Sequence, residues 1–90
     1  MYKIKFSKLA LKDKKLIEKS KLIKIVNNLL HKIEENPFCY PPSYEKLNLK
    51  YKMYSRRISR QHRLVYMVNE EKKEIYIIRM WTHYELVDKK

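Results

Sequence analysis

The chain has 90 residues, no glycine and a formal net charge of +12, from 22 Lys and Arg against 10 Asp and Glu. The length excludes several domains, so one domain over residues 1–90 is expected, with residues 85–90 as a frayed tail. The lack of glycine excludes P-loops and dinucleotide-binding loops, because both need glycine where the backbone closely approaches phosphate.

A net positive charge of this size indicates that the charge serves the function of the protein. Like charges of this number repel one another in a compact molecule, and they favour a polyanionic partner. Nucleic acid is the first candidate, an acidic protein the second and an anionic membrane surface the third. A solvated lysine surface without any partner is the alternative.

Metal, disulfide and membrane chemistry find no support in the sequence. Cys39 is alone, and His31, His62 and His83 are too far apart for zinc spacing, so no metal site and no cofactor are expected. No apolar run approaches the ~20 residues of a membrane span. The first residues alternate charged and apolar side chains too early for a signal peptide, and a cytoplasmic location is therefore expected.

The first elements are a short strand and a helix. Residues 2–6 alternate apolar and basic side chains, which is the period of a strand with one buried face. Ser7 is placed to cap a helix over residues 8–18, and Ser20 is placed to cap the next one.

A second, longer helix has the strongest pattern in the chain. Its apolar residues step by three and four positions, which places six side chains on one stripe. They are Leu22, Ile25, Val26, Leu29, Leu30 and Ile33. The helix should end near Asn36, because Pro37 disfavours helical geometry in the residue before it.

The second half predicts a loop and then an antiparallel meander. Residues 37–52 begin as a proline-stiffened loop. Residues 53–60, 63–69 and 74–81 are rich in Tyr, Ile and Val, and short turns separate them. The fold class is therefore α+β: an N-terminal strand, two helices and a three-strand antiparallel meander. The helices should cover one face of the sheet and leave the arginines on the open face.

Arginine gathers in the meander, while lysine dominates elsewhere. Its planar fork suits phosphate, and the interleaved Tyr51, Tyr54 and Tyr66 offer faces on which bases could stack. For Tyr54 and Tyr66, a place in the core is the simpler interpretation. The residues that could carry chemistry are Glu45, Arg56, Arg57, Arg60, His62, Arg63, His83 and Tyr84.

RNA carries its own nucleophile, the 2′-hydroxyl. An enzyme that uses it needs a base for the 2′ proton, a cation for the crowded phosphorane and an acid for the departing 5′-oxygen. Glu45, Arg63 and His83 lie on three different segments and could fill these roles. Taken alone, Glu45 would be a surface carboxylate paired with a lysine, and His62 would be a structural residue in a turn.

One segment resembles a known family. Residues 55–68, SRRISRQHRLVYMV, are similar to the signature of the YoeB (also called Txe) toxins of the RelE superfamily. Three further features agree with it: Pro37 and Phe38 after the long helix, Glu45 before the arginine pair, and a chain end with His83 next to Tyr84. The resemblance covers nearly the whole chain in the order of its elements.

The resemblance implies a role for each matching residue. Glu45 would be the general base, Arg63 would stabilise the scissile phosphate, His83 would be the general acid, and Tyr84 would position the substrate. Arg57 would be the second arginine of the site, Arg56 would contact the RNA backbone, and one of the two loop lysines, Lys46 or Lys50, would bind phosphate. Arg60, from the arginine cluster itself, is a further candidate for binding RNA.

The activity implied is metal-independent cleavage of messenger RNA in the ribosomal A site, which leaves a 2′,3′-cyclic phosphate and stops translation. The implied partners are messenger RNA, the ribosome and an acidic antitoxin of the YefM/Axe type, and a homodimer is consistent with the family. Two alternatives remain: a ParE-like toxin that binds DNA gyrase without catalysis, and a plain basic RNA-binding module. Glu45, His83 and Tyr84 argue against the gyrase binder, which would need neither base nor acid.

Overall fold

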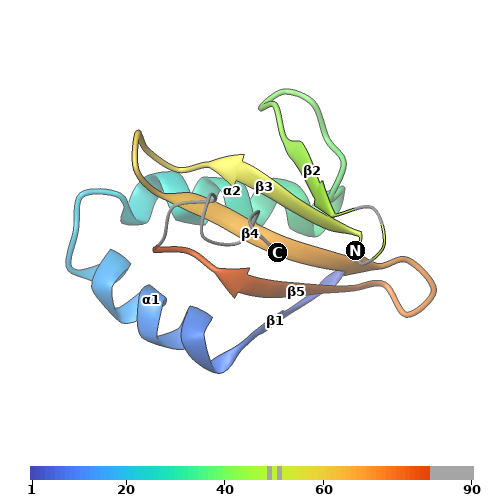
Figure 1. The fold of residues 1–90 in the computed structure, drawn as a ribbon, viewed down its shortest axis with the longest axis horizontal. Helices are drawn as coiled ribbons and strands as arrows, with labels where there is room; N and C mark the ends of the chain where they lie inside the picture. The colour runs from blue at the N-terminus through green and yellow to red at the C-terminus, as the bar shows by residue number, and fades with distance from the viewer. Residues whose placement is uncertain (49, 51, 82–90) are drawn as a thin grey trace.

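The structure is a computed structural model, and it describes residues 1–48, 50 and 52–81. These residues form a five-stranded mixed sheet and two helices (Figure 1). The elements are β1 (Lys3–Phe6), α1 (Lys8–Glu18), α2 (Ile23–Glu35), β2 (Glu45–Asn48), β3 (Met53–Arg57), β4 (Arg63–Asn69) and β5 (Glu74–Arg79). The predicted α+β class is confirmed, and the predicted order of the elements holds except for one added strand. The predicted tail over residues 85–90 lies outside the described residues.

The strand order is β1-β5-β4-β3-β2, so the meander forms the middle of the sheet. β1 pairs in parallel with β5, and the other neighbours are antiparallel. β2 lies at the edge, in the segment that was predicted to be a loop. It has four residues and a register shift between Lys46 and Asn48, so it lacks the long alternation that reveals a strand. β3 and β5 also end earlier than predicted, at Arg57 and Arg79.

Both helices begin near the predicted serines. The Ser7 hydroxyl accepts a hydrogen bond from the Ala10 amide at 3.0 Å and donates one to the Ile78 carbonyl at 2.8 Å, which ties the start of α1 to β5. The Ser20 hydroxyl accepts from the Leu22 amide, but Leu22 is the N-cap of α2 and no side chain caps that helix, so the prediction that Ser20 caps it is wrong. No helix in the described part of the chain is long and apolar enough to cross a membrane.

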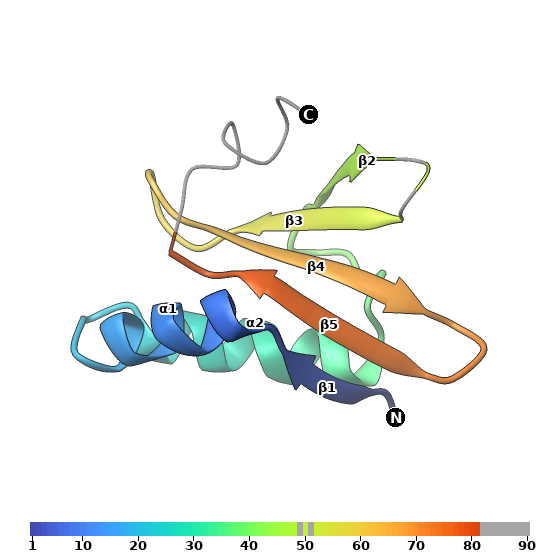
Figure 2. The ribbon, with the colours of Figure 1, turned by 60° about the horizontal axis from the view of Figure 1, so that its bottom comes forward.

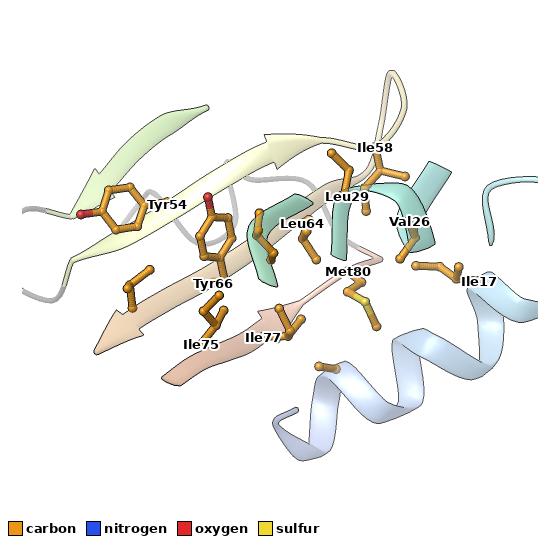
Figure 3. Close-up of a cluster of buried hydrophobic side chains, with 13 residues drawn as sticks. Ile17, Val26, Leu29, Tyr54, Ile58, Leu64, Tyr66, Ile75, Ile77 and Met80 are labelled. Atoms are coloured by element: carbon orange, nitrogen blue, oxygen red, sulfur yellow. The ribbon is translucent and has the colours of Figure 1, made fainter. Parts of the chain in front are cut away.

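Both helices lie on the same side of the sheet, as predicted, and the other face is turned away from them (Figure 2). Apolar side chains from α1, α2 and the inner face of the sheet form the core (Figure 3). The core residues are Ala10, Ile17, Val26, Leu29, Ile33, Tyr54, Ile58, Leu64, Tyr66, Val68, Ile75, Ile77 and Met80. Tyr54 and Tyr66 are therefore core residues, so the simpler interpretation of them is confirmed.

The helices bury a narrower stripe than the sequence suggests. Of the six apolar residues predicted on the long helix, Val26, Leu29 and Ile33 are buried, whereas Ile25 is 44% exposed. In α1 the buried side chains are those of Ala10, Asp13 and Ile17. The leucines of α1 remain about half exposed.

Candidate active site

The predicted base and two of the predicted arginines share the open face of the sheet. Glu45 begins β2, Arg57 ends β3 and Arg63 begins β4. Glu45 is paired with Ser55, and Arg57 is paired with Arg63. Side chains alternate along a strand, so residues 45, 55, 57 and 63 all lie on the face away from the helices.

The three charged side chains converge on one hollow. A pocket of about 350 Å³ is lined by Ser43, Tyr44, Glu45, Arg57 and Arg63. Nη1 of Arg63 donates to Oε1 of Glu45 at 3.0 Å. The Arg63 side chain is 15% exposed and that of Glu45 is 54% exposed, so the guanidinium is sheltered and the carboxylate is open to solvent. The pocket combines a proton acceptor with two cations, as catalysis on a phosphodiester requires.

Ser43 and Tyr44 line this pocket although sequence reasoning did not select them. The Tyr44 ring packs edge-on against Tyr54, with centroids 5.8 Å apart, and it also approaches Phe38. The only signal in the sequence was the position of these two residues directly before Glu45. Because aromatic residues are common in cores, the sequence alone would assign Tyr44 to the core and would miss its place in the pocket wall.

The prediction that Arg56 contacts the RNA backbone is wrong. Arg56 is 1% exposed and lies on the helix-facing side of β3, opposite in direction to Arg57. Its guanidinium donates to the Tyr66 hydroxyl and to the carbonyls of Pro37, Cys39 and Pro42. All of these acceptors belong to the protein itself, so the guanidinium is directed into the protein and away from the open face.

Tyr66 belongs to the same buried network. Its hydroxyl accepts from Arg56 Nε at 3.0 Å and donates to the Pro37 carbonyl at 2.8 Å. Burial raises the pKa of the Tyr66 phenol to about 12, against the opposing effect of the hydrogen bond and charge of Arg56. The phenol therefore stays protonated and keeps its donor role at neutral pH.

The remaining predicted basic residues do not line the pocket. Arg60 is exposed in the connection between β3 and β4. Lys46 is exposed and is paired with Tyr54, which places it on the opposite face from Glu45. Lys50 is exposed as well. Of the predicted phosphate-binding residues, only Arg57 is brought to the pocket within the described part of the chain.

His83 and Tyr84 lie outside the described residues, but the chain just before them is firmly held. The buried Asp13 carboxylate on α1 accepts from Nε of Arg79 at 2.8 Å and from the Met80 amide at 2.9 Å. Burial alone would raise the pKa of the Asp13 carboxyl, but hydrogen bonds from Arg79 and from the amides of Met80 and Trp81 outweigh it and lower the pKa below its usual value.

A second contact holds the same end of the chain. The His62 ring stacks on the Trp81 ring, with centroids 3.9 Å apart and planes 23° apart. His62 lies between β3 and β4, and its carbonyl accepts from the Ile58 and Ser59 amides. The structural interpretation of His62 agrees with these contacts. Since His62 directly precedes Arg63, the stack brings the end of β5 to the side of the sheet where β4 begins.

Comparisons with known proteins give one family. A family model of YoeB-like toxins of bacterial type II toxin-antitoxin systems matches residues 6–84. A search of curated proteins found no match. Among solved structures, the YoeB–YefM complex from Staphylococcus aureus is 34% identical, with a TM-score of 0.75 over 93% of this chain and 99% of that chain.

Two further structures share the fold. A YoeB dimer from Staphylococcus aureus is 34% identical, with a TM-score of 0.78 over 92% of this chain and 98% of that chain. A YoeB/ParE toxin from Agrobacterium tumefaciens is 24% identical, with a TM-score of 0.81 over 91% of this chain and 99% of that chain. Because the family model spans most of the sequence, the chain belongs to the YoeB-like toxins of bacterial type II toxin-antitoxin systems.

Proposed function

We propose that this toxin is a ribosome-dependent endoribonuclease that cleaves messenger RNA in the A site by metal-independent acid–base chemistry. One observation carries the proposal: the Glu45 carboxylate and the Arg57 and Arg63 guanidinium groups meet in one pocket on the open face of the sheet. This face is not covered by the helices (Figure 2).

The reaction uses the hydroxyl of the RNA itself. Glu45 takes the proton from the 2′-hydroxyl, and the 2′-oxygen then attacks the adjacent phosphorus. Arg63 stabilises the negative charge of the phosphorane, with Arg57 as a second cation. The bond from phosphorus to the 5′-oxygen breaks, and His83 gives its proton to that oxygen. The products are a 2′,3′-cyclic phosphate and a free 5′-hydroxyl.

Chain connectivity supports the assignment of the acid. His83 follows Trp81 by two residues, and two residues span at most about 7 Å between Cα atoms. The Trp81 ring is stacked on His62, the residue before Arg63. Tyr84 is proposed to position the substrate beside His83.

The partners follow from charge and family. A net charge of +12 suits messenger RNA and the ribosome, and it also suits an acidic antitoxin of the YefM/Axe type. The Staphylococcus aureus relative is seen both in a complex with YefM and as a dimer, which supports an antitoxin partner and a homodimer for this chain. A cytoplasmic location would place the toxin with these partners. The exposed Arg60, Lys46 and Lys50 are proposed to contact the RNA backbone.

The test is cleavage of a reporter messenger in a translation extract, read as primer-extension stops. The wild type should cleave, while Glu45→Ala and His83→Gln should each lower the rate about 10²–10⁴-fold, the usual contribution of a general base or acid. Tyr76→Phe, an exposed change on β5, is the control and should cleave normally.

Equal cleavage by the wild type and both variants would remove the catalytic assignments. If the wild type cleaves nothing but inhibits DNA gyrase, the chain acts as a ParE-like binder. If it does neither and its expression leaves growth unchanged, only a basic RNA-binding module remains.

A further inference from the structure

We propose that Arg56 is a positioning residue for Glu45: a buried cation that clamps the segment before β2 and so fixes where the base enters the pocket. This inference rests on the proposed nuclease function. It assigns to Arg56 a role that is neither contact with RNA nor a general contribution to the core.

The clamp consists of hydrogen bonds to one short segment. Arg56 Nη1 donates to the Pro42 carbonyl at 2.6 Å. Its Nη2 donates to the carbonyls of Cys39 at 2.9 Å and Pro37 at 3.0 Å. One planar guanidinium thus holds three carbonyls spread over residues 37–42. That segment lies outside the helices and strands. Its first residues are also held by turn bonds, from the Cys39 amide to the Asn36 carbonyl at 3.1 Å and from the Phe38 amide to the Asn36 side chain at 3.0 Å.

Tyr66 reinforces the clamp from β4. Its hydroxyl accepts from Arg56 and donates to the Pro37 carbonyl, so it bridges the guanidinium and the start of the segment. The phenol and the guanidinium are both buried, and the Tyr66 hydroxyl is the acceptor of the Arg56 Nε–H. Loss of either group leaves an unsatisfied buried polar atom, which is costly.

The clamp continues into the pocket through Tyr44. The Arg56 guanidinium carbon lies 4.8 Å from the Tyr44 ring centroid, within the range of a cation–π contact. Tyr44 lines the pocket and directly precedes Glu45. The residues on both sides of the base are therefore constrained, because Arg56 holds the chain before it and β3 pairs with the strand after it.

The charge of Arg56 argues for a role beyond stability. Among the described residues, no carboxylate pairs with it, and its partners are neutral oxygens and an aromatic ring. A buried cation without a counter-charge is expensive, and an apolar side chain often stabilises a core at least as well. An apolar side chain has no donors, however, so it cannot hold three carbonyls in one geometry as the Arg56 guanidinium does. Orientation of a reacting group is worth much in catalysis, where an error of 1 Å can cost about 100-fold.

The experiment compares Tyr66→Phe with Tyr54→Phe in the otherwise intact chain. Tyr66→Phe removes a hydroxyl that belongs to the clamp, whereas Tyr54→Phe removes one from the neighbouring ring, which makes no hydrogen bond among the described residues. We expect Tyr66→Phe to lower the single-turnover rate on programmed ribosomes about 10-fold with an unchanged KM. Tyr54→Phe should leave both values unchanged.

Arg56→Met and Arg56→Lys complete the series. Arg56→Met should lower the rate about 100-fold, and Arg56→Lys should recover part of the loss because it restores a donor. Each rate is measured on protein shown to be folded by circular dichroism. Wild-type rates in folded Tyr66→Phe and Arg56→Met would overturn the proposal, because a purely structural role changes stability but not the rate per folded molecule.

A readout without RNA separates this inference from the proposed nuclease function. Tyr66→Phe should speed hydrogen exchange of the backbone amides of β2 at least 10-fold relative to Tyr54→Phe. Unchanged exchange in β2 would overturn the clamp even if the wild type cleaves RNA. Faster exchange in Tyr66→Phe, together with a wild type that cleaves no RNA, would mean that the clamp exists and the nuclease function fails.

Discussion

The segment before Glu45 and the segment before His83 are both held by one buried charged side chain, but the two charges are opposite. Arg56 holds residues 37–42 through neutral carbonyls, and no carboxylate pairs with it in the described residues. Asp13 holds residues 79–81 through the Arg79 guanidinium and backbone amides. One anchor is a cation among acceptors, and the other is an anion among donors.

Because the two charges are opposite, the two sides of the proposed site should respond differently to pH. A guanidinium keeps its charge at every pH at which proteins normally fold. The Asp13 carboxylate has a lowered pKa, so it loses its charge only in acid. We therefore expect acid to release the end that leads to His83 while the end that leads to Glu45 stays in place.

The largest effect is expected from removal of the Asp13 charge. Asp13→Asn leaves Arg79 without a counter-charge and weakens the bonds to two amides, which should lower the free energy of unfolding by about 3 kcal/mol at pH 7. Urea unfolding measures the change. Glu18→Gln, on the same helix but without an ion pair among the described residues, is the control and should stay within about 0.5 kcal/mol of wild type.

The stability difference between wild type and Asp13→Asn should also depend on pH. Since the folded-state pKa of Asp13 lies below its ordinary value of 3.8, its contribution to stability is full above that value and is lost as the pH falls through the folded-state pKa. The stability gap between wild type and Asp13→Asn should therefore close in acid. An unchanged gap at pH 2 would mean that the carboxylate is not the source of the effect.

Loss of the stack between His62 and Trp81 should give a smaller change in stability. His62→Ala should lower the free energy of unfolding by about 1 kcal/mol, and His62→Phe should restore most of it because a ring is present again. Trp81 is the chain's one tryptophan, so tryptophan fluorescence reports on the environment of this one ring. Identical emission spectra of wild type and His62→Ala would show that the rings do not stack in solution.

The smallest expected change in stability comes from substitution of Tyr44, which precedes Glu45. Tyr44→Leu removes the ring beneath the Arg56 charge and should cost about 0.5–1 kcal/mol of stability, whereas Tyr44→Phe keeps the ring and should cost less. Thermal unfolding compares the two variants. Equal melting temperatures for both would argue that the ring does not contribute to holding Arg56.

Local periodicity was enough to predict most of the fold. β1, both helices and the three meander strands have runs of side chains whose spacing reveals them. β2 could not be found in this way, because its four residues acquire their strand geometry by pairing with β3 and a bulge interrupts even that pairing. Edge strands of this kind depend on tertiary contacts more than on their own sequence.

The site was predictable in part. Glu45, Arg57 and Arg63 meet because their positions at strand ends place them on one face. Arg56 was misassigned because β4, its neighbour, is apolar on both faces and therefore does not reveal which arginine of the pair points inward. Asp13 was overlooked as a site anchor, since its partner Arg79 is 66 residues away and no local pattern connects them.

The ion pair between Glu45 and Arg63 has a consequence for how substrate enters. At 3.0 Å, the carboxylate that would start the reaction is bonded to Nη1, one of the guanidinium nitrogens that a phosphate could use. A phosphate that binds Nη1 competes with this internal anion, and a substrate that is held in place by a larger assembly has the advantage over a loose strand. By the same reasoning, Glu45→Gln should bind an uncleavable RNA more tightly than the wild type does, although it cannot cut it.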